Sequence, residues 1–291
     1  MTAVYMLAPQ SSVQMMSFIL KSNDHMVVID GGNNCDADYL FSYVKKLGGV
    51  VDGWFFTHPH SDHCNAFNTL MENCPHELEI RGLYYSFLPM ECLCDGGDPG
   101  APKSKDCQNA VSSIIRMNAQ IKKHGLKVTT LQKGDVFTFG EMTFTVLRVA
   151  DENMVSDNVI NNSSAVLRLD ANGKSMIFLG DLGVEGGLQL LDTTSPELLK
   201  ADMVQVAHHG QKGVGREVYE AIDADYCFWC TPDWLWDNDR GLGYDTHTYK
   251  TIVTRGWLSD IGVKRHYVSK DGTHEVRFDD LNLLEYKQKN K

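Results

Sequence analysis

The sequence predicts an α/β fold in which two β-sheets pack against each other and helices cover their outer faces. Apolar side chains make up 43% of the 291 residues, which is enough for a large buried core. Strand-like and helix-like segments follow in the same order in both halves, as is typical of layered α/β architectures. No linker-like segment separates the halves. We therefore expect one domain built of two similar halves, about 1–125 and 126–291.

The first half alternates apolar runs with turn residues. Residues 39–47 carry apolar side chains at helical spacing and end at Gly48-Gly49. Residues 86–108 are rich in proline and glycine and form the longest irregular stretch, a candidate lid or rim insertion. The expected strands are 13–20, 26–30, 54–57 and 80–85, and the expected helices are 39–47 and 107–123.

The second half begins with further strands and contains a clear hairpin. Two apolar runs flank the turn Ala171-Asn172-Gly173-Lys174, a composition that favours a tight hairpin turn. A buried strand at 203–207 leads directly into two histidines. The other expected elements are strands at about 127–131, 136–139, 142–149 and 226–230, a helix at 247–258 and a terminal hairpin near 265–278.

Composition limits the classes of function. The formal net charge of -11 disfavours a protein that mainly coats nucleic acid, because such binding depends on Lys and Arg contacts to phosphate. The sequence has no run of about 20 apolar residues that would span a membrane, and no basic, then apolar leader. The eight cysteines are too sparse for a disulfide scaffold. We therefore expect a cytoplasmic protein with reduced thiols.

The strongest chemical signal is the segment Thr57-His58-Pro59-His60-Ser61-Asp62-His63. Four metal-ligand side chains lie within six residues, where an apolar strand ends and a helix is expected to begin. His58 and His60 alternate, so they can face one ion, while Asp62 and His63 can reach a second ion. Imidazole and carboxylate ligands suit zinc, manganese or iron. A chance cluster of surface histidines would need four coincidences.

Two further motifs each follow an apolar strand. Gly180-Asp181-Leu182-Gly183 places one carboxylate between glycines, and by itself it would be read as a turn or a helix cap. Beside the first motif, Asp181 is a candidate bridging ligand between two ions about 3.5–4 Å apart. His208-His209-Gly210 offers one more ligand, and the other histidine could contact substrate, donate a proton or serve as a buried partner of a ligand.

These motifs, in this order and separation, resemble those of the metallo-β-lactamase superfamily across nearly the whole chain. Asn161-Asn162-Ser163-Ser164 with the later Gly-Asp-Leu-Gly and His-His-Gly resembles the hydrolase domain of bacterial competence DNA-uptake proteins and the related phosphorylcholine esterases. The resemblance implies a bacterial hydrolase with a four-layer αβ/βα sandwich of two mixed sheets. It also implies that the metal ions lie at one edge of both sheets.

Residue roles carry over from the family by position. His58 and His60 match the first metal site, Asp62 and His63 the second, Asp181 the bridging carboxylate and His209 the last ligand. His208 matches a substrate-side position, so Asp62, Asp181 and His208 are the expected catalytic groups. Many relatives have a further histidine where this chain has Asn161–Ser164. The first site therefore keeps fewer strong ligands, and either one ion binds or an Asn carboxamide (Asn161 or Asn162) contributes.

Additional residues are expected around the cleft. His247 lies where relatives carry a histidine that faces the substrate, and the alternative is an ordinary residue at a helix start. Tyr244 and Asn162 are further candidate substrate contacts, and Trp234 or Trp236 could line the same cleft. Asp30, before Gly31-Gly32, is expected to hold a ligand histidine from behind.

The resemblance implies hydrolysis by a metal-bound hydroxide, with one or two divalent ions as cofactor: zinc or manganese, with iron as a further option. The expected substrate is a small phosphodiester or related phosphoester, and nucleic acid is disfavoured by the net charge. The same scaffold also acts on lactones, thioesters and β-lactams. A degenerate metal-free binding module and a di-iron redox protein are the non-hydrolytic alternatives.

Overall fold

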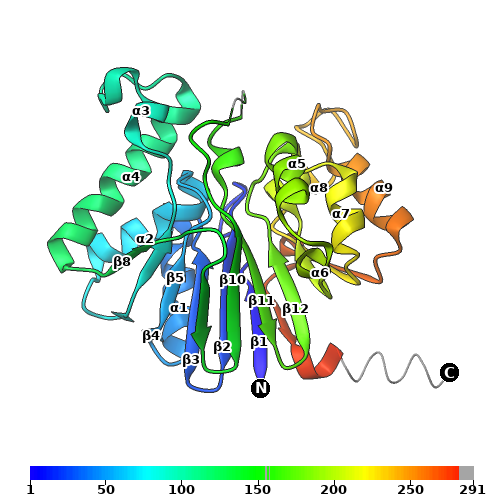
Figure 1. Ribbon diagram of the computed structural model, residues 1–291, viewed down its shortest axis with the longest axis horizontal. Coiled ribbons are helices and arrows are strands. Elements are labelled where there is room, and N and C mark those ends of the chain that lie inside the picture. The colour runs from blue at the N-terminus through cyan, green and yellow to red at the C-terminus, as the bar shows by residue number, and fades with distance from the viewer. Residues whose placement is uncertain (155, 157, 282–291) are drawn as a thin grey trace.

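Two seven-stranded sheets lie face to face in the computed structural model, which describes residues 1–154, 156 and 158–281. Figure 1 shows the strands in the centre, helices of the first half on one side and helices of the second half on the other. The expected architecture of two mixed sheets flanked by helices is confirmed.

The first sheet joins antiparallel strands on one side to parallel strands on the other. Its order is β16 (His274–Arg277), β1 (Thr2–Met6), β2 (Ser17–Ser22), β3 (His25–Asp30), β5 (Gly53–Phe55), β7 (Leu83–Tyr85) and β8 (Val128–Thr130). The pairs from β16 to β3 are antiparallel, and those from β3 to β8 are parallel. Parallel neighbours need crossover connections. These contain α1 (Ala37–Lys46), α2 (Ser61–Asn73) and α4 (Lys105–His124).

The second sheet repeats this plan. Its order is β15 (Arg265–Val268), β14 (Tyr226–Trp229), β13 (Met203–Gln205), β12 (Lys174–Phe178), β11 (Val166–Ala171), β10 (Met142–Arg148) and β9 (Val136–Phe139). Strands β9 to β12 pair antiparallel and β12 to β15 pair parallel. The helices that follow its strands are α5 (Val184–Thr193), α6 (Pro196–Leu199), α7 (Arg216–Ile222), α8 (Asp233–Trp236) and α9 (Thr251–Ile261).

Several expected boundaries are wrong. The terminal hairpin does not form, because β15 pairs with β14 in the second sheet whereas β16 pairs with β1 in the first. The strand expected from residue 13 begins only at Ser17, and the one expected at 80–85 is split into β6 (Glu79–Ile80) and β7. β6 pairs with β4 (Val50–Val51) in a separate two-stranded sheet. β8 also joins the first sheet, so both halves contribute strands to it.

The main core lies between the two sheets. Phe18 from the first sheet packs edge-on against Phe178 and Phe228 of the second, with ring centroids 5.2 and 6.2 Å apart. All three rings are fully buried. Separate apolar clusters fill the space between each sheet and its outer helices. Large apolar side chains on both faces of the central strands therefore hold the four layers together.

Residues 86–108 fold into a small cap. They contain α3 (Met90–Leu93) and the short 3-10 turn Asp95–Gly97, and α4 begins at Lys105. Leu88, Leu93 and Cys107 belong to a separate buried cluster beneath this segment. Figure 1 shows α3 projecting beyond the sheets at the end where α4 starts. The segment thus packs through an apolar cluster that it shares with α4 and Ile160. Its identification as a lid or rim insertion stays a prediction.

Within the described residues, no helix combines the length and the apolar character needed to cross a bilayer.

We expect Phe18→Ala to lower the free energy of unfolding by about 3–5 kcal/mol, because it leaves a cavity between the sheets. Urea denaturation measures the loss. Val136→Ala is the control: this side chain is 59% exposed, and its truncation should change stability by less than about 0.5 kcal/mol. Equal effects of the two substitutions would contradict the assignment of Phe18 to the central core.

Candidate metal centre

The first motif lies where β5 passes into α2. His58 is fully buried just beyond the strand, and His60 is the residue that precedes the first turn of α2. Asp62 and His63 lie in that first turn. The carboxyl ends of neighbouring parallel strands meet at one sheet edge, where α/β proteins gather functional groups. The strand end therefore directs the motif into the space between the sheets.

The other two motifs end strands of the facing sheet at the same edge. Asp181 follows β12, and His208 and His209 follow β13 in the 3-10 turn Ala207–Gly210. His208 and His209 both have a positive φ angle, 51° and 53° respectively, which residues with a Cβ rarely adopt. Gly180 also has φ 57°, and a Cβ there would lie 2.9 Å from Ser164 Oγ. The backbone is strained to bring these groups together.

The structure brings all six expected ligands together in two groups that share Asp181. One group is His58, His60 and Asp181; the other is Asp62, His63, Asp181 and His209. Within each group the ligand atoms lie within 4.8 Å of one another, so each could hold a metal ion.

Distances between ligand atoms define the two groups. His58 Nε2 lies 3.0 Å from His60 Nδ1 and 3.8 Å from Asp181 Oδ2. His209 Nε2 lies 3.3 Å from Asp62 Oδ2 and 3.4 Å from Asp181 Oδ2. His63 Nε2 lies 3.4 Å from Asp181 Oδ1.

Three candidate ligand atoms have no hydrogen-bond partner in the described protein, and a bound metal ion would supply one interaction for each. His63 Nε2, His209 Nε2 and Asp181 Oδ1 are buried and make no hydrogen bond within the described residues. Buried polar atoms are rarely left without a partner, because each costs about 1–3 kcal/mol. Imidazole nitrogens and carboxylate oxygens are the usual ligands of zinc. The donor set therefore fits the divalent ions that the sequence predicts.

Each ring of the second group is held from behind through its other nitrogen. His63 Nδ1 lies 2.7 Å from Asp30 Oδ2, and His209 Nδ1 lies 2.8 Å from the Cys230 carbonyl oxygen. Asp30 is fully buried and also accepts hydrogen bonds from the Thr57 amide and hydroxyl. Such outer partners fix the tautomer and the orientation of a ligand histidine. The position expected for Asp30 behind a ligand agrees with this geometry.

The first group is contacted by Ser164, from the segment Asn161–Ser164 named above, and by Asp106, which no sequence motif indicated. His58 Nδ1 lies 3.3 Å from Ser164 Oγ, which also accepts a hydrogen bond from the Asp181 amide. His60 Nε2 lies 2.9 Å from Asp106 Oδ1 in the first turn of α4. Nothing in the sequence marks Asp106, because its role depends on how the cap and α4 dock against α2.

Burial and mutual charge set the ionisation of the protein groups. Burial opposes the imidazolium form of His209, but Asp181 and Asp62 outweigh it and raise its pKa to about 9. Burial likewise opposes the imidazolium form of His63, but Asp181 and Asp30 raise the pKa of His63 well above its ordinary value. Burial would raise the pKa of Asp181, but His209 and His63 hold it well below the usual range. Metal ions would replace these protons, since ligand histidines bind in the neutral form.

His208 is near the centre but belongs to neither ligand group. Its Nε2 lies 3.9 Å from Asp181 Oδ2 and 3.3 Å from Asn161 Nδ2, while Nδ1 lies 3.2 Å from the Lys212 carbonyl oxygen. That carbonyl can only accept, so Nδ1 carries the proton and Nε2 of the neutral ring is an acceptor. Burial lowers the pKa of His208, which favours this neutral form.

Asn161 and Asn162 have different surroundings. Asn161 Oδ1 is buried without a hydrogen bond among the described residues, beside His208. Asn162 Oδ1 instead accepts from the Gly183 and Gly186 amides, and Nδ2 donates to Ser156 and Glu185. These bonds use its whole amide to fix the start of α5. Asn161 is therefore the better-placed candidate, and the expected role of Asn162 in substrate binding or metal ligation stays a prediction.

The structure does not bring His247 and Tyr244 to the ligand groups. Helix α9 begins at Thr251, so the expectation that His247 opens this helix is wrong. His247 is exposed and stacks on Tyr249 at 4.4 Å, and Tyr244 is 61% exposed. A pocket of about 490 Å³ that includes Asp62 is lined by Trp234, Arg240 and Tyr249 but not by these two side chains. Trp234 thus lines this pocket, whereas Trp236 packs edge-on against Trp229.

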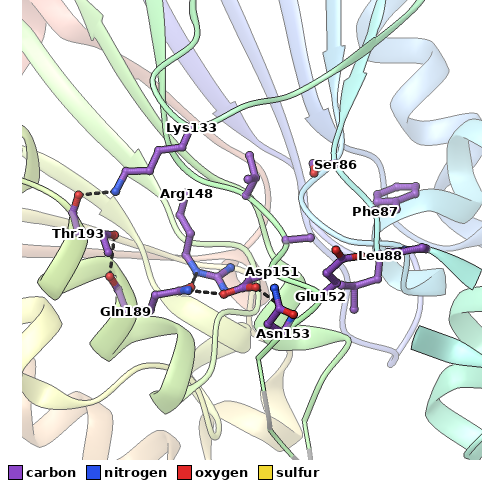
Figure 2. Close-up of a pocket in the computed structure, with 13 residues that line it drawn as sticks. Ser86, Phe87, Leu88, Lys133, Arg148, Asp151, Glu152, Asn153, Gln189 and Thr193 are labelled. Atoms are coloured by element: carbon purple, nitrogen blue, oxygen red, sulfur yellow. Dashed lines mark hydrogen bonds between the residues drawn. The ribbon is translucent and has the colours of Figure 1, made fainter. Parts of the chain in front are cut away.

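A second pocket of about 490 Å³, shown in Figure 2, is lined by none of the candidate ligands. Arg148 is buried in its wall and donates to Gln189 Oε1 and to the Ser164 carbonyl oxygen, both at 2.9 Å. Burial lowers the pKa of Arg148 to about 10. Because Ser164 also contacts His58, Arg148 supports the ligand group through one intervening residue.

Comparisons with known proteins bear on the family and the fold. The sequence profile of the metallo-beta-lactamase superfamily matches residues 13–149. ComE operon protein 3 of Bacillus subtilis (strain 168) is 34% identical over 102 residues, which are 35% of this chain and 12% of that protein. The resemblance to this superfamily and to competence proteins is confirmed, although the match spans a small part of the relative.

Solved structures show the same fold over almost the whole chain. The metallo-beta-lactamase fold protein YhfI from Bacillus subtilis has 13% identity and a TM-score of 0.55, with 95% of this chain and 100% of that chain covered. Igni18, a metallo hydrolase from Ignicoccus hospitalis KIN4/I, has 10% identity and a TM-score of 0.53, with 96% and 100% covered. The E377D mutant of CmlA beta-hydroxylase has 12% identity and a TM-score of 0.54, with 95% and 54% covered. A fold shared by differently named activities does not select the chemistry.

We expect Asp106→Ala to weaken metal binding at the His58–His60 group by about 10- to 100-fold, because His60 loses the carboxylate that orients it. Calorimetric titration of the metal-free protein with Mn²⁺ or Zn²⁺ measures the change. Affinity at the group containing Asp62 and His209 should not change. Asp95→Ala removes an exposed carboxylate of the same cap and is the matched control. Identical titrations for Asp106→Ala and the unmodified protein would contradict the role of Asp106.

Proposed function

Because the chain has the metallo-β-lactamase fold and matches that superfamily through its first histidine motif, we propose that it is a metal-dependent phosphodiesterase. The observation that carries the proposal is the pair of ligand groups that share the Asp181 carboxylate. Two ions about 3.5–4 Å apart suit in-line displacement at phosphorus, where the attacking and leaving oxygens both need stabilisation. The resemblance of Asn161–Ser164 and His208-His209-Gly210 to phosphoesterases of the superfamily favours phosphoesters over carboxylic-acid derivatives.

We propose zinc or manganese as the cofactor, held by His58, His60 and Asp181 on one side. Asp62, His63 and His209 would hold the second ion together with Asp181. Divalent ions bound there would lower the pKa of a bound water from 15.7 toward about 7 and neutralise charge on a phosphoryl oxygen. Asp30 and Asp106 then keep the imidazoles of His63 and His60 oriented, so that little reorganisation accompanies the reaction.

His208 is the proposed proton-transfer group. Its Nε2 faces the ligand groups, and because Nδ1–H donates to the Lys212 carbonyl oxygen, Nε2 is free to accept a proton from the attacking water. The imidazolium so formed lies 3.9 Å from Asp181 Oδ2, whose charge stabilises it. It can then return the proton to the leaving oxygen. From the sequence, His208 was expected to donate a proton or to contact phosphate. In the tautomer with the proton on Nδ1, His208 would first accept a proton at Nε2 and donate it afterwards.

We expect the protein to hydrolyse bis(p-nitrophenyl) phosphate when Mn²⁺ or Zn²⁺ is added, and Asp181→Ala to abolish that activity. Release of p-nitrophenol measures both. The same assay is run with a β-lactam, a lactone and a phosphorylcholine ester. Full activity of Asp181→Ala, or activity confined to the carboxylic-acid derivatives, would refute the proposal.

We expect His208→Gln to lower kcat on bis(p-nitrophenyl) phosphate by about 10²- to 10⁴-fold, in line with the loss of a general base. Metal content, measured by atomic emission, should stay as in the unmodified protein, because His208 is outside both ligand groups. His76→Gln alters an exposed histidine elsewhere and is the control. A parallel loss of metal and activity in His208→Gln would show that this residue is a ligand instead.

A further inference from the structure

The pocket beside Asp62 connects the candidate metal centre to an aromatic wall. Asp62 itself lines this space of about 490 Å³, together with Gln14, Trp234, Arg240 and Tyr249. Gln14 Nε2 lies 3.3 Å from Asp62 Oδ2, so the pocket lining contacts a candidate ligand directly. Any substrate group that leaves the metal centre on this side therefore meets the aromatic wall.

Arg240 is held flat against that wall. Its guanidinium carbon lies 3.4 Å from the Trp234 ring centroid and 5.8 Å from that of Tyr249. Its Nη2 lies 3.3 Å from the Tyr249 hydroxyl. Trp234 is fixed in turn, because its Nε1 donates to the Ser12 carbonyl oxygen at 2.6 Å. A stacked guanidinium loses little further freedom when it binds a ligand.

The carboxylates adjacent to Arg240 in sequence do not neutralise it. Asp239 Oδ1 accepts three backbone hydrogen bonds from residues 241–243, and Asp245 Oδ1 accepts one from Asn238. Within the described part of the chain, no carboxylate lies within ion-pair distance of Arg240. In a protein with a net charge of -11, Arg240 is therefore an arginine without an ion-pair partner among the described residues, in the same pocket as the candidate ligand Asp62.

We propose that Arg240, stacked on Trp234, binds a second phosphoryl group of the substrate, next to the phosphoester that is cleaved at the metal centre. A planar guanidinium forms paired hydrogen bonds to phosphate oxygens, and its charge offsets the repulsion between a phosphate and the Asp62 carboxylate. Among the described lining residues, Asp62 is the one carboxylate, and it is a candidate metal ligand. The inference rests on the proposed function and narrows its substrate class to phosphodiesters that carry an additional phosphate.

Two esters that differ only in the second phosphate test the inference: thymidine 5′-(p-nitrophenyl phosphate) with and without a 3′-phosphate. We expect kcat/KM to be at least about 10-fold higher for the ester with the 3′-phosphate, as for a hydrogen-bonded charged group. In Arg240→Gln the ratio of the two kcat/KM values should fall to about 1. Arg240→Lys, which keeps the charge but not the planar fork, should give an intermediate ratio.

A binding measurement separates this inference from the proposed function. Calorimetry of the manganese-loaded protein should give at least about 10-fold tighter binding of thymidine 3′,5′-bisphosphate than of thymidine 5′-monophosphate. Arg240→Gln should abolish this difference. Arg265→Gln removes an arginine that also stacks on an aromatic ring, Tyr267, but does not line the pocket, so the difference should persist.

Each outcome then bears on one claim. If neither ester is hydrolysed but the binding preference disappears only in Arg240→Gln, the phosphate site stands and the phosphodiesterase proposal fails. If both esters are hydrolysed at equal kcat/KM and the two nucleotides bind equally, the phosphate site is refuted while the phosphodiesterase proposal stands. A preference that survives in Arg240→Gln also refutes the role of Arg240.

Discussion

The arrangement of the candidate site depends on one buried carboxylate, Asp181, which lies among the four imidazole rings of His58, His63, His208 and His209. A carboxylate removed from water costs several kcal/mol unless opposite charge compensates for the lost hydration. Asp181 Oδ1 has no hydrogen-bond donor among the described residues, whereas His63 Nε2 and His209 Nε2 each lie 3.4 Å from its oxygens. The compensation is therefore electrostatic, and either protons on the rings or bound cations supply it. That requirement is what makes this sheet edge a candidate metal centre.

Both sheets are needed to build this centre, which explains why the two halves are joined so closely. Asp30 at the end of β3 fixes His63, and the Cys230 carbonyl just after β14 fixes His209. The Ala165 amide donates to the Thr57 carbonyl oxygen and links the two sheets at the same edge. The C-terminal strand β16 then pairs with β1, so the last described strand completes the first sheet. Separating the halves would expose the central core and take the ligands apart.

The fold class and the clustering of the six candidate ligands could be predicted from apolar strands that end in histidine or aspartate, together with the resemblance to the superfamily. Their role as metal ligands stays a prediction. Strand pairings and side-chain contacts between residues that are far apart in the sequence could not be predicted. Residues 2–6 give no turn signal, and β1 is recognisable only from its pairing with β2 and β16. The bonds that tie Asn162 to the start of α5 are tertiary, so no pattern in the sequence indicates them. Asp106 and Arg240 carry no motif, and their positions follow from how the cap and the loop after α8 pack.

Anomalous X-ray diffraction from crystals grown with Mn²⁺ tests the central claim most directly. We expect two peaks about 3.5–4 Å apart, on either side of the Asp181 carboxylate. One peak should have His58 and His60 as neighbours, and the other Asp62, His63 and His209. Peaks at any other place, or an ordered crystal of the manganese-soaked protein with no peak at this edge of the sheets, would contradict it.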